Sequence, residues 1–124
     1  MKIIDAADAP AFDMPGVRFT GLAAPSRGAR ETAAWRIAVE AGTPARFHQV
    51  TREEIFIATG GRARFHIGGR EHELVAGGCA IVPPNVDFAL SNPFDAPFEA
   101  VVVFPVGGQA MLAGEAPFVP PWAA

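Results

Sequence analysis

The chain has 124 residues, half of them apolar and 19% charged, and its formal net charge is −3 at pH 7. This length and apolar content suit one folded domain with a real core, and they argue against disorder. No basic stripe marks a nucleic-acid surface, and no apolar run reaches the ~20 residues that a membrane helix needs. The first residues carry acidic groups and lack the apolar region of a signal peptide, so we expect a cytoplasmic protein.

Short apolar runs between many glycines and prolines predict strands rather than helices. Trp35, Ile37 and Val39 alternate with other residues, which is the period of two that a strand requires. Gly68-Gly69 separates two such runs and predicts a tight hairpin. We expect one all-β, antiparallel sandwich or barrel domain with a core at 17–106, an arm at 1–16 and a Pro-rich tail at 107–124. The predicted strands lie at 17–22, 32–40, 46–50, 54–59, 62–67, 70–75, 79–82, 87–90 and 98–106.

Two of these strands, at 54–59 and 98–106, are apolar on both faces. An antiparallel strand with one face in water should alternate between apolar and polar residues. The outer faces of both strands therefore need a cover, which the N-terminal strand, the tail or a second subunit could supply. We expect a homodimer.

The chemistry concentrates between Gly42 and Gly61. His48 is followed six residues later by Glu54, which opens the apolar run from Ile55 to Ala58. A buried ionisable group is costly unless it is paired or used. The cysteine count offers no competing site, because the single Cys79 excludes an internal disulfide and the common zinc-ribbon patterns.

The spacing in this region resembles the two motifs of small single-domain cupins. The first motif is Gly, five residues, His-x-His, three or four residues, Glu, six residues and Gly. The second is Gly, five residues, Pro-x-Gly, two residues, His, three residues and Asn. The resemblance implies an antiparallel jelly-roll β-barrel with its pocket in the interior. The matching residues are Gly42, His48, Glu54, Gly61, Gly77, Pro83 and Asn92.

The departures from these motifs bear on the metal that the resemblance implies, which three His and one Glu would hold. Val50 replaces one of these His residues and Phe88 replaces another, so His48 and Glu54 alone remain. Catalytic zinc normally has three protein ligands. We therefore expect no cofactor; the alternative is a weakly held divalent metal (Fe, Mn, Zn or Ni) at His48 and Glu54. Asn85 replaces a glycine, which is tolerable because Asn also adopts the left-handed backbone conformation.

Three functions stay open at this point. The first is binding of a small, mostly apolar molecule in the barrel without an intact metal centre. The second is an enzyme, either a metal-dependent oxygenase or isomerase with a degenerate site, or a metal-free isomerase, cyclase or lyase that uses Glu54 and His48 as an acid/base pair. The third is a packed barrel that acts as a structural or interaction protein. The predicted pocket residues are Val50, Phe56, Phe88, Phe47 and Phe65.

Two arginines could bind a carboxylate group of a ligand. Arg36 and Arg46 lie on predicted strands, and a guanidinium matches a carboxylate well. The alternative is a solvated strand face, since Arg is rarely fully buried.

Overall fold

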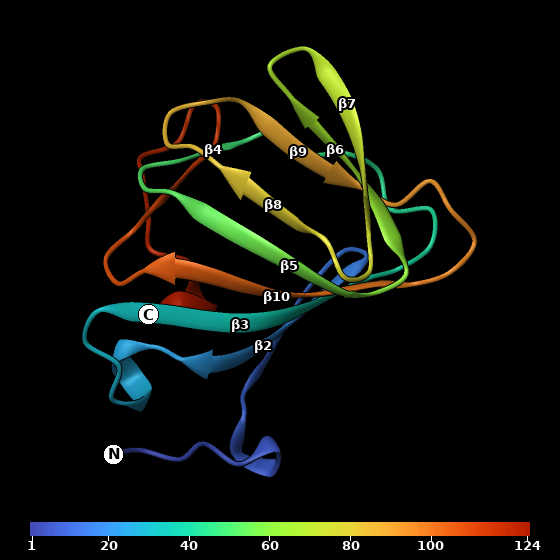
Figure 1. Cartoon of the computed structure of the whole chain (residues 1–124). Helices are drawn as coiled ribbons and strands as arrows, with labels where there is room; N and C mark the ends of the chain where they lie inside the picture. The colour runs from blue at the N-terminus through green and yellow to red at the C-terminus, as the bar shows by residue number, and fades with distance from the viewer.

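The computed structural model describes all 124 residues, and its regular secondary structure is almost entirely β-strand (Figure 1). The predicted all-β, antiparallel jelly-roll fold is confirmed. No helix in it is long and apolar enough to span a membrane. The strands are β1 Ala11–Met14, β2 Val17–Ala23, β3 Thr32–Val39, β4 Gln49–Val50, β5 Glu54–Gly60, β6 Arg62–Ile67, β7 Arg70–Val75, β8 Cys79–Val82, β9 Phe88–Ser91, β10 Phe98–Pro105 and β11 Ala110–Met111, and the 3-10 helices are η1 Ala6–Asp8, η2 Pro25–Arg27 and η3 Pro121–Ala123.

Two main sheets and one short strand pair form the jelly roll. The larger sheet has the strand order β1-β2-β3-β10-β5-β8, and the smaller has the order β7-β6-β9. Figure 1 shows β2, β3, β10, β5 and β8 side by side in this order. Strands far apart in the chain are neighbours, since β10 pairs with both β3 and β5. This long-range antiparallel pairing is typical of a jelly roll.

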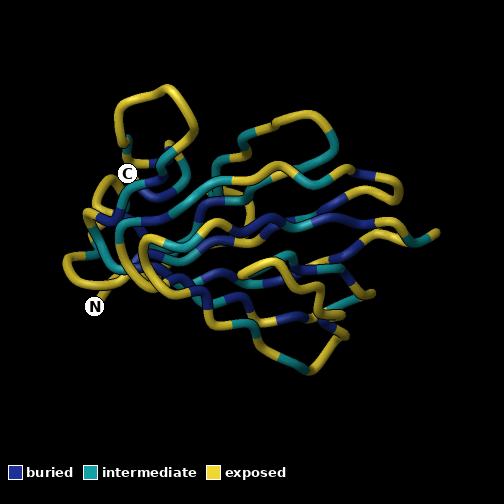
Figure 2. The backbone as a smooth tube through the Cα atoms, turned by 90° about the horizontal axis from the view of Figure 1, so that it is seen from above, coloured by how far each residue is buried: buried dark blue, intermediate teal, exposed yellow.

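The core lies along the inner face of the larger sheet. Val102 on β10 is opposite Trp35 on β3 and Phe56 on β5, and all three side chains are buried. Alternation along β3 and β10 sends every second side chain inward. Figure 2 shows the consequence, with buried segments along the middle of the strands and exposed turns at their ends.

Two predicted turns have the expected backbone conformation. Gly68 and Gly69 have φ values of 58° and 74° and join Ile67 to Arg70 across a two-residue hairpin. Positive φ at both central residues is the type I′ geometry that matches strand twist. Asn85, where the resemblance places a glycine, has φ of 62° and is the only non-glycine residue with positive φ.

The arm and the tail contain more structure than the sequence predicts. β1 lies in the arm and pairs with β2, and β11 lies in the tail and pairs with β4. β4 covers only Gln49–Val50 instead of 46–50, because His48 contributes a single bridge, to Phe88. These pairings depend on distant partners, which local periodicity does not show.

Candidate functional site

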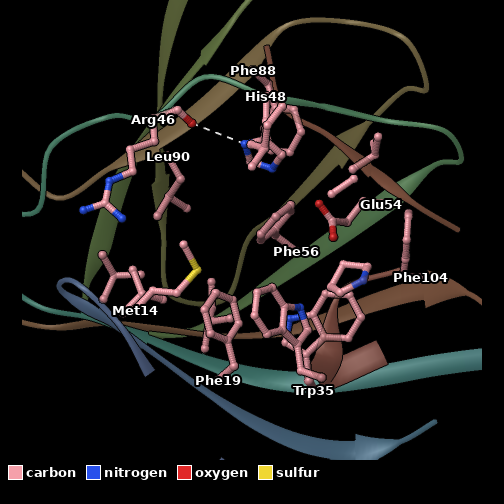
Figure 3. A pocket seen from close by; sticks show the side chains of 18 of the residues that line it. Met14, Phe19, Trp35, Arg46, His48, Glu54, Phe56, Phe88, Leu90 and Phe104 are labelled. Atoms are coloured by element: carbon pink, nitrogen blue, oxygen red, sulfur yellow. Dashed lines mark hydrogen bonds between the residues drawn. The ribbon is translucent and has the colours of Figure 1, made fainter. Parts of the chain in front are cut away.

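A cavity of about 270 Å³ lies inside the jelly roll, at the end where β4 and β5 begin (Figure 3). Twenty-one residues line it, of which 15 are hydrophobic. The single acidic side chain among them is Glu54 and the single permanently cationic one is Arg46. Its wall contains seven Phe and Trp side chains, which are Phe19, Trp35, Phe56, Phe88, Phe104, Phe118 and Trp122.

Glu54 is the first residue of β5, and it faces the cavity together with Phe56. Its side chain is only 6% exposed, and no ion pair in the structure involves it. Burial raises the pKa of Glu54 to about 8, because the ionised carboxylate loses its hydration. At neutral pH this group is therefore mainly a carboxylic acid, which can donate a hydrogen bond into the cavity.

His48 is held at the cavity by the backbone of the neighbouring segments. It forms a backbone bridge to Phe88, and the two rings lie 4.4 Å apart between centroids. Its Nδ1 atom is 3.3 Å from the carbonyl oxygen of Arg46. A carbonyl can only accept, so this contact requires the proton on Nδ1 and leaves a lone pair on Nε2.

The charge state of His48 complements that of Glu54. Burial lowers the pKa of His48 below its ordinary value of 6.5, and the hydrogen bond to the Arg46 carbonyl opposes this more weakly. The imidazole is therefore neutral at pH 7. Figure 3 shows the imidazole and the Glu54 carboxyl group both turned into the cavity. The site thus presents one neutral donor and one neutral acceptor.

Three of the five predicted pocket residues line this cavity, and two do not. Val50, Phe56 and Phe88 form part of its wall. Phe47 was expected there but is 58% exposed, and its ring contacts that of His66 at 5.9 Å between centroids. Its neighbour His48 faces inward, and successive residues of an extended chain point to opposite sides.

Phe65 is the second predicted pocket residue that does not line this cavity. It is 1% exposed and packs against Phe56 with ring centroids 5.1 Å apart, so it belongs to the core behind the cavity wall. It also lines a separate cavity of about 260 Å³, between β6, β7 and β8, which shares no residue with the first. Its inward direction was predicted correctly, but the period of two does not show which cavity an inward side chain reaches.

Several lining residues were missed because they lie in the arm and the tail. Met14 comes from β1, and Phe118, Pro120 and Trp122 come from the tail. Trp122 stacks on Phe19 of β2 with ring centroids 3.6 Å apart. The one signal in the sequence was the presence of large apolar residues among the prolines of the tail.

The side chains present do not fit a firmly held metal ion. Where the cupin resemblance implies further His ligands, Val50 and Phe88 contribute buried apolar groups to the cavity wall. No group of three or more His, Cys, Asp and Glu side chains is placed so that it could hold a metal. His66 is engaged elsewhere, with Nε2 2.9 Å from Oγ of Ser91. Two donors fall short of the three that catalytic zinc and non-haem iron sites use.

Comparisons with known proteins agree with the fold. No curated protein matches the sequence. Polyketide cyclase RemF from Streptomyces resistomycificus is similar in structure, with 18% identity, a TM-score of 0.76, and coverage of 94% of this chain and 87% of that one. An RmlC-like cupin from Shewanella frigidimarina NCIMB 400 has 19% identity, a TM-score of 0.71 and coverage of 83% and 88%.

A third similar structure is DMSP lyase DddQ from Ruegeria pomeroyi DSS-3, with 27% identity, a TM-score of 0.59, and coverage of 73% of this chain and 44% of that one. The family profile described as the cupin domain matches residues 34–104, which is more than half of the chain. This segment contains both spaced motifs, the whole of β5, and β10 except for its last residue. The chain is a member of the cupin family.

Proposed function

We propose that this protein binds a small, mostly apolar molecule in the barrel cavity and holds one polar group of it with Glu54 and His48, without a metal ion. The observation that carries the proposal is the carboxyl group of Glu54. It is 6% exposed and faces the cavity, and burial is the one cause of its raised pKa, with no hydrogen bond or ion pair contributing. A carboxyl group in apolar surroundings loses much of its hydration, and a ligand that accepts its hydrogen bond offsets that cost.

The cavity itself supports binding more than it supports a barrel packed shut. Its volume of about 270 Å³ lies near the lower end of the range for small-molecule sites. Its wall is apolar with few polar groups, which is the usual composition of such sites. A ligand of one or two rings matches this space better than a larger molecule.

A thermal-shift screen of small ring compounds against the purified protein tests this proposal. A ligand that binds only the folded state stabilises it by about 2.7 kcal/mol at 100 times its Kd, which raises Tm by several degrees. Val50→Phe is the matched control, because Val50 lines the cavity and the larger side chain narrows it. We expect hits for the wild type that disappear in a folded Val50→Phe variant. Equal shifts in both proteins, or none in the wild type, would contradict binding in the cavity.

A metal-free acid/base enzyme is the second candidate, and a specific observation favours it. A neutral carboxylic acid and a neutral imidazole face the same cavity at pH 7. His48 Nε2 can take a proton from the carbon next to a ligand carbonyl while Glu54 gives its proton to the carbonyl oxygen, which forms an enol. Two of the similar structures are named as a cyclase and a lyase, which is compatible with an enzyme but assigns no reaction to this chain.

Deuterium exchange into 2-tetralone, a two-ring ketone with acidic protons beside its carbonyl, tests for this chemistry. In heavy water, each enol that returns to the ketone takes up deuterium, and proton NMR follows the loss of signal. We expect exchange faster than in buffer, and a drop of about 100-fold or more towards the buffer rate in Glu54→Gln and in His48→Ala. Unchanged exchange in both variants would eliminate the enzyme and leave the binding protein.

A further inference from the structure

Arg46 contributes a positive charge to a cavity that has no other permanent cation. Its side chain is exposed, which places the guanidinium at the opening, and no ion pair or side-chain hydrogen bond engages it. The backbone of Arg46 is fixed, because its carbonyl oxygen accepts the hydrogen bond from His48. Figure 3 shows the guanidinium at one side of the cavity and the Glu54 carboxyl group at the other.

Aromatic side chains form much of the cavity wall near these two polar ends. Phe56 lies between Arg46 and Glu54, Phe19 and Trp35 lie below them on the wall, and the aliphatic Leu90 lies next to Arg46 (Figure 3). Aromatic side chains stack on flat rings or meet them edge to face, and each such contact adds to the gain from burial. A flat ring system therefore matches the middle of the cavity better than a flexible aliphatic chain.

Building on the proposed binding function, we infer that the ligand is a planar ring compound with a carboxylate at one end and a hydroxyl or carbonyl oxygen at the other. The carboxylate pairs with Arg46 at the opening, and the oxygen accepts from Glu54 in the interior. The rings fill the aromatic section between them. This assignment makes Arg46 a specificity-determining residue.

The charge pattern favours a carboxylate over other ionic groups. One guanidinium matches a singly charged carboxylate through two parallel N–H···O bonds. A phosphate group normally uses several donors or a helix N-terminus, and here the lining supplies a single cationic side chain and the nearby helices are single turns. A cationic ligand is disfavoured, because Arg46 repels it and Glu54 is mainly uncharged.

Calorimetric titration with 6-hydroxy-2-naphthoate and its methyl ester tests the inference, because the two probes share rings and hydroxyl and differ in charge. We expect the acid to bind the wild type about fivefold more tightly than the ester, because one partly exposed ion pair adds only a small amount of binding free energy. In Arg46→Gln the two probes should bind equally. Arg36→Gln is the matched control, since Arg36 is exposed, lies outside the cavity and should leave the preference intact. Raising the salt concentration should reduce the preference in the wild type.

The outcomes separate this inference from the function on which it rests. Equal binding of acid and ester to the wild type, or a preference that survives in Arg46→Gln, overturns the carboxylate assignment and leaves cavity binding in place. Failure of both probes to bind the wild type counts against the proposed binding function and removes the assignment with it. A preference for the acid that is lost in Arg46→Gln and kept in Arg36→Gln supports both the carboxylate assignment and the proposed binding function.

Discussion

Glu54 couples the stability of the fold to pH. In the unfolded chain its carboxyl group titrates near its ordinary pKa of 4.5, and in the folded protein burial raises this pKa to about 8. Between these values the folded state holds a proton that the unfolded state has lost. The free energy of unfolding therefore falls as pH rises through this window, by at most about 1.4 kcal/mol per pH unit from this group. Below pH 4.5 and above pH 8 the contribution of Glu54 to the free energy of unfolding does not change with pH.

Glu54→Gln should remove this pH dependence, because the amide does not titrate. We expect the variant to gain several kcal/mol relative to the wild type between pH 5 and pH 8, as measured by urea unfolding at each pH. The lowered pKa of His48 has the opposite sign, since neutral imidazole is favoured in the fold and stability rises with pH near 6.5. Both proteins contain His48, so its effect largely cancels in the difference. A difference that stays constant with pH would mean that Glu54 is not buried and protonated.

Val50 and Phe88 should be the residues that keep a metal out of the site. Both are buried in the cavity wall, and the ring of Phe88 lies 4.4 Å from that of His48. Val50→His combined with Phe88→His adds two imidazoles to His48 and Glu54, which gives a four-donor set. We expect the double variant to bind one Co²⁺ with the visible absorption of a nitrogen-coordinated ion, and the wild type to show none. Adding His48→Ala to the double variant should weaken this binding; an unaltered spectrum would place the metal elsewhere.

The tail forms part of the cavity wall because β2 and η2 hold it there. The Arg27 guanidinium donates to the carbonyl oxygen of Leu22 at 2.7 Å and to that of Trp122 at 3.3 Å. Trp122 in turn stacks on Phe19 and lines the cavity. A Cβ at Gly21 would lie 2.5 Å from Nη2 of Arg27, so a larger residue there would displace the guanidinium from this position.

Arg27→Met should loosen the tail without removing its apolar contacts. The variant keeps much of the side-chain length but loses the donors to both carbonyl groups, and we expect it to lose about 1–3 kcal/mol of stability. Probe affinity should fall several-fold, and acrylamide should quench Trp fluorescence more strongly. Arg30→Met is the control, because Arg30 is exposed and its side chain makes no hydrogen bond or ion pair in the structure. Unchanged quenching in Arg27→Met would show that the Trp122 stack holds the tail by itself.

Elements set by local signals are predictable from the sequence. The strands Arg62–Ile67, Arg70–Val75 and Cys79–Val82 have the predicted bounds, because glycine turns and alternation mark their ends. The two-residue strand Ala110–Met111 was missed, since it is extended through pairing with the distant β4 and a bridge to Phe118, which local periodicity does not show. The same dependence on distant partners limits prediction of the site. Motif spacing indicated His48 and Glu54, whereas Trp122 and Met14 reach the cavity only through the tertiary fold.

The outer face of the larger sheet is apolar across three neighbouring strands. Ile55 pairs with Ile81 on one side and Val103 on the other, and Ile57 pairs with Val101. Ile57 and Ile81 are 42% and 61% exposed. The two possible covers within the chain lie elsewhere, because β1 pairs with the far edge of the sheet at β2 and Trp122 packs on Phe19. We propose that a second copy of the chain covers this face, which gives a homodimer.

Charged substitutions on this outer face should separate the subunits. In Ile57→Lys/Ile81→Lys, two lysines would have to be desolvated at the interface, and we expect sedimentation velocity to show a monomer where the wild type sediments as a dimer. Val75→Lys is the matched control, since Val75 is 54% exposed on β7 of the other sheet. A wild type that remains monomeric at high protein concentration contradicts the dimer directly.

The central claim is that the cavity binds a small molecule through protein groups alone, and a Trp fluorescence titration tests it most directly. Both tryptophans of the chain, Trp35 and Trp122, line the cavity, so a ligand there must change their emission. Chelator-treated wild type titrated with 6-hydroxy-2-naphthoate should show a saturable one-to-one change that is absent in Val50→Phe. A change of the same size in Val50→Phe, no change in the wild type, or a change that appears only after a divalent metal is added back would contradict the claim.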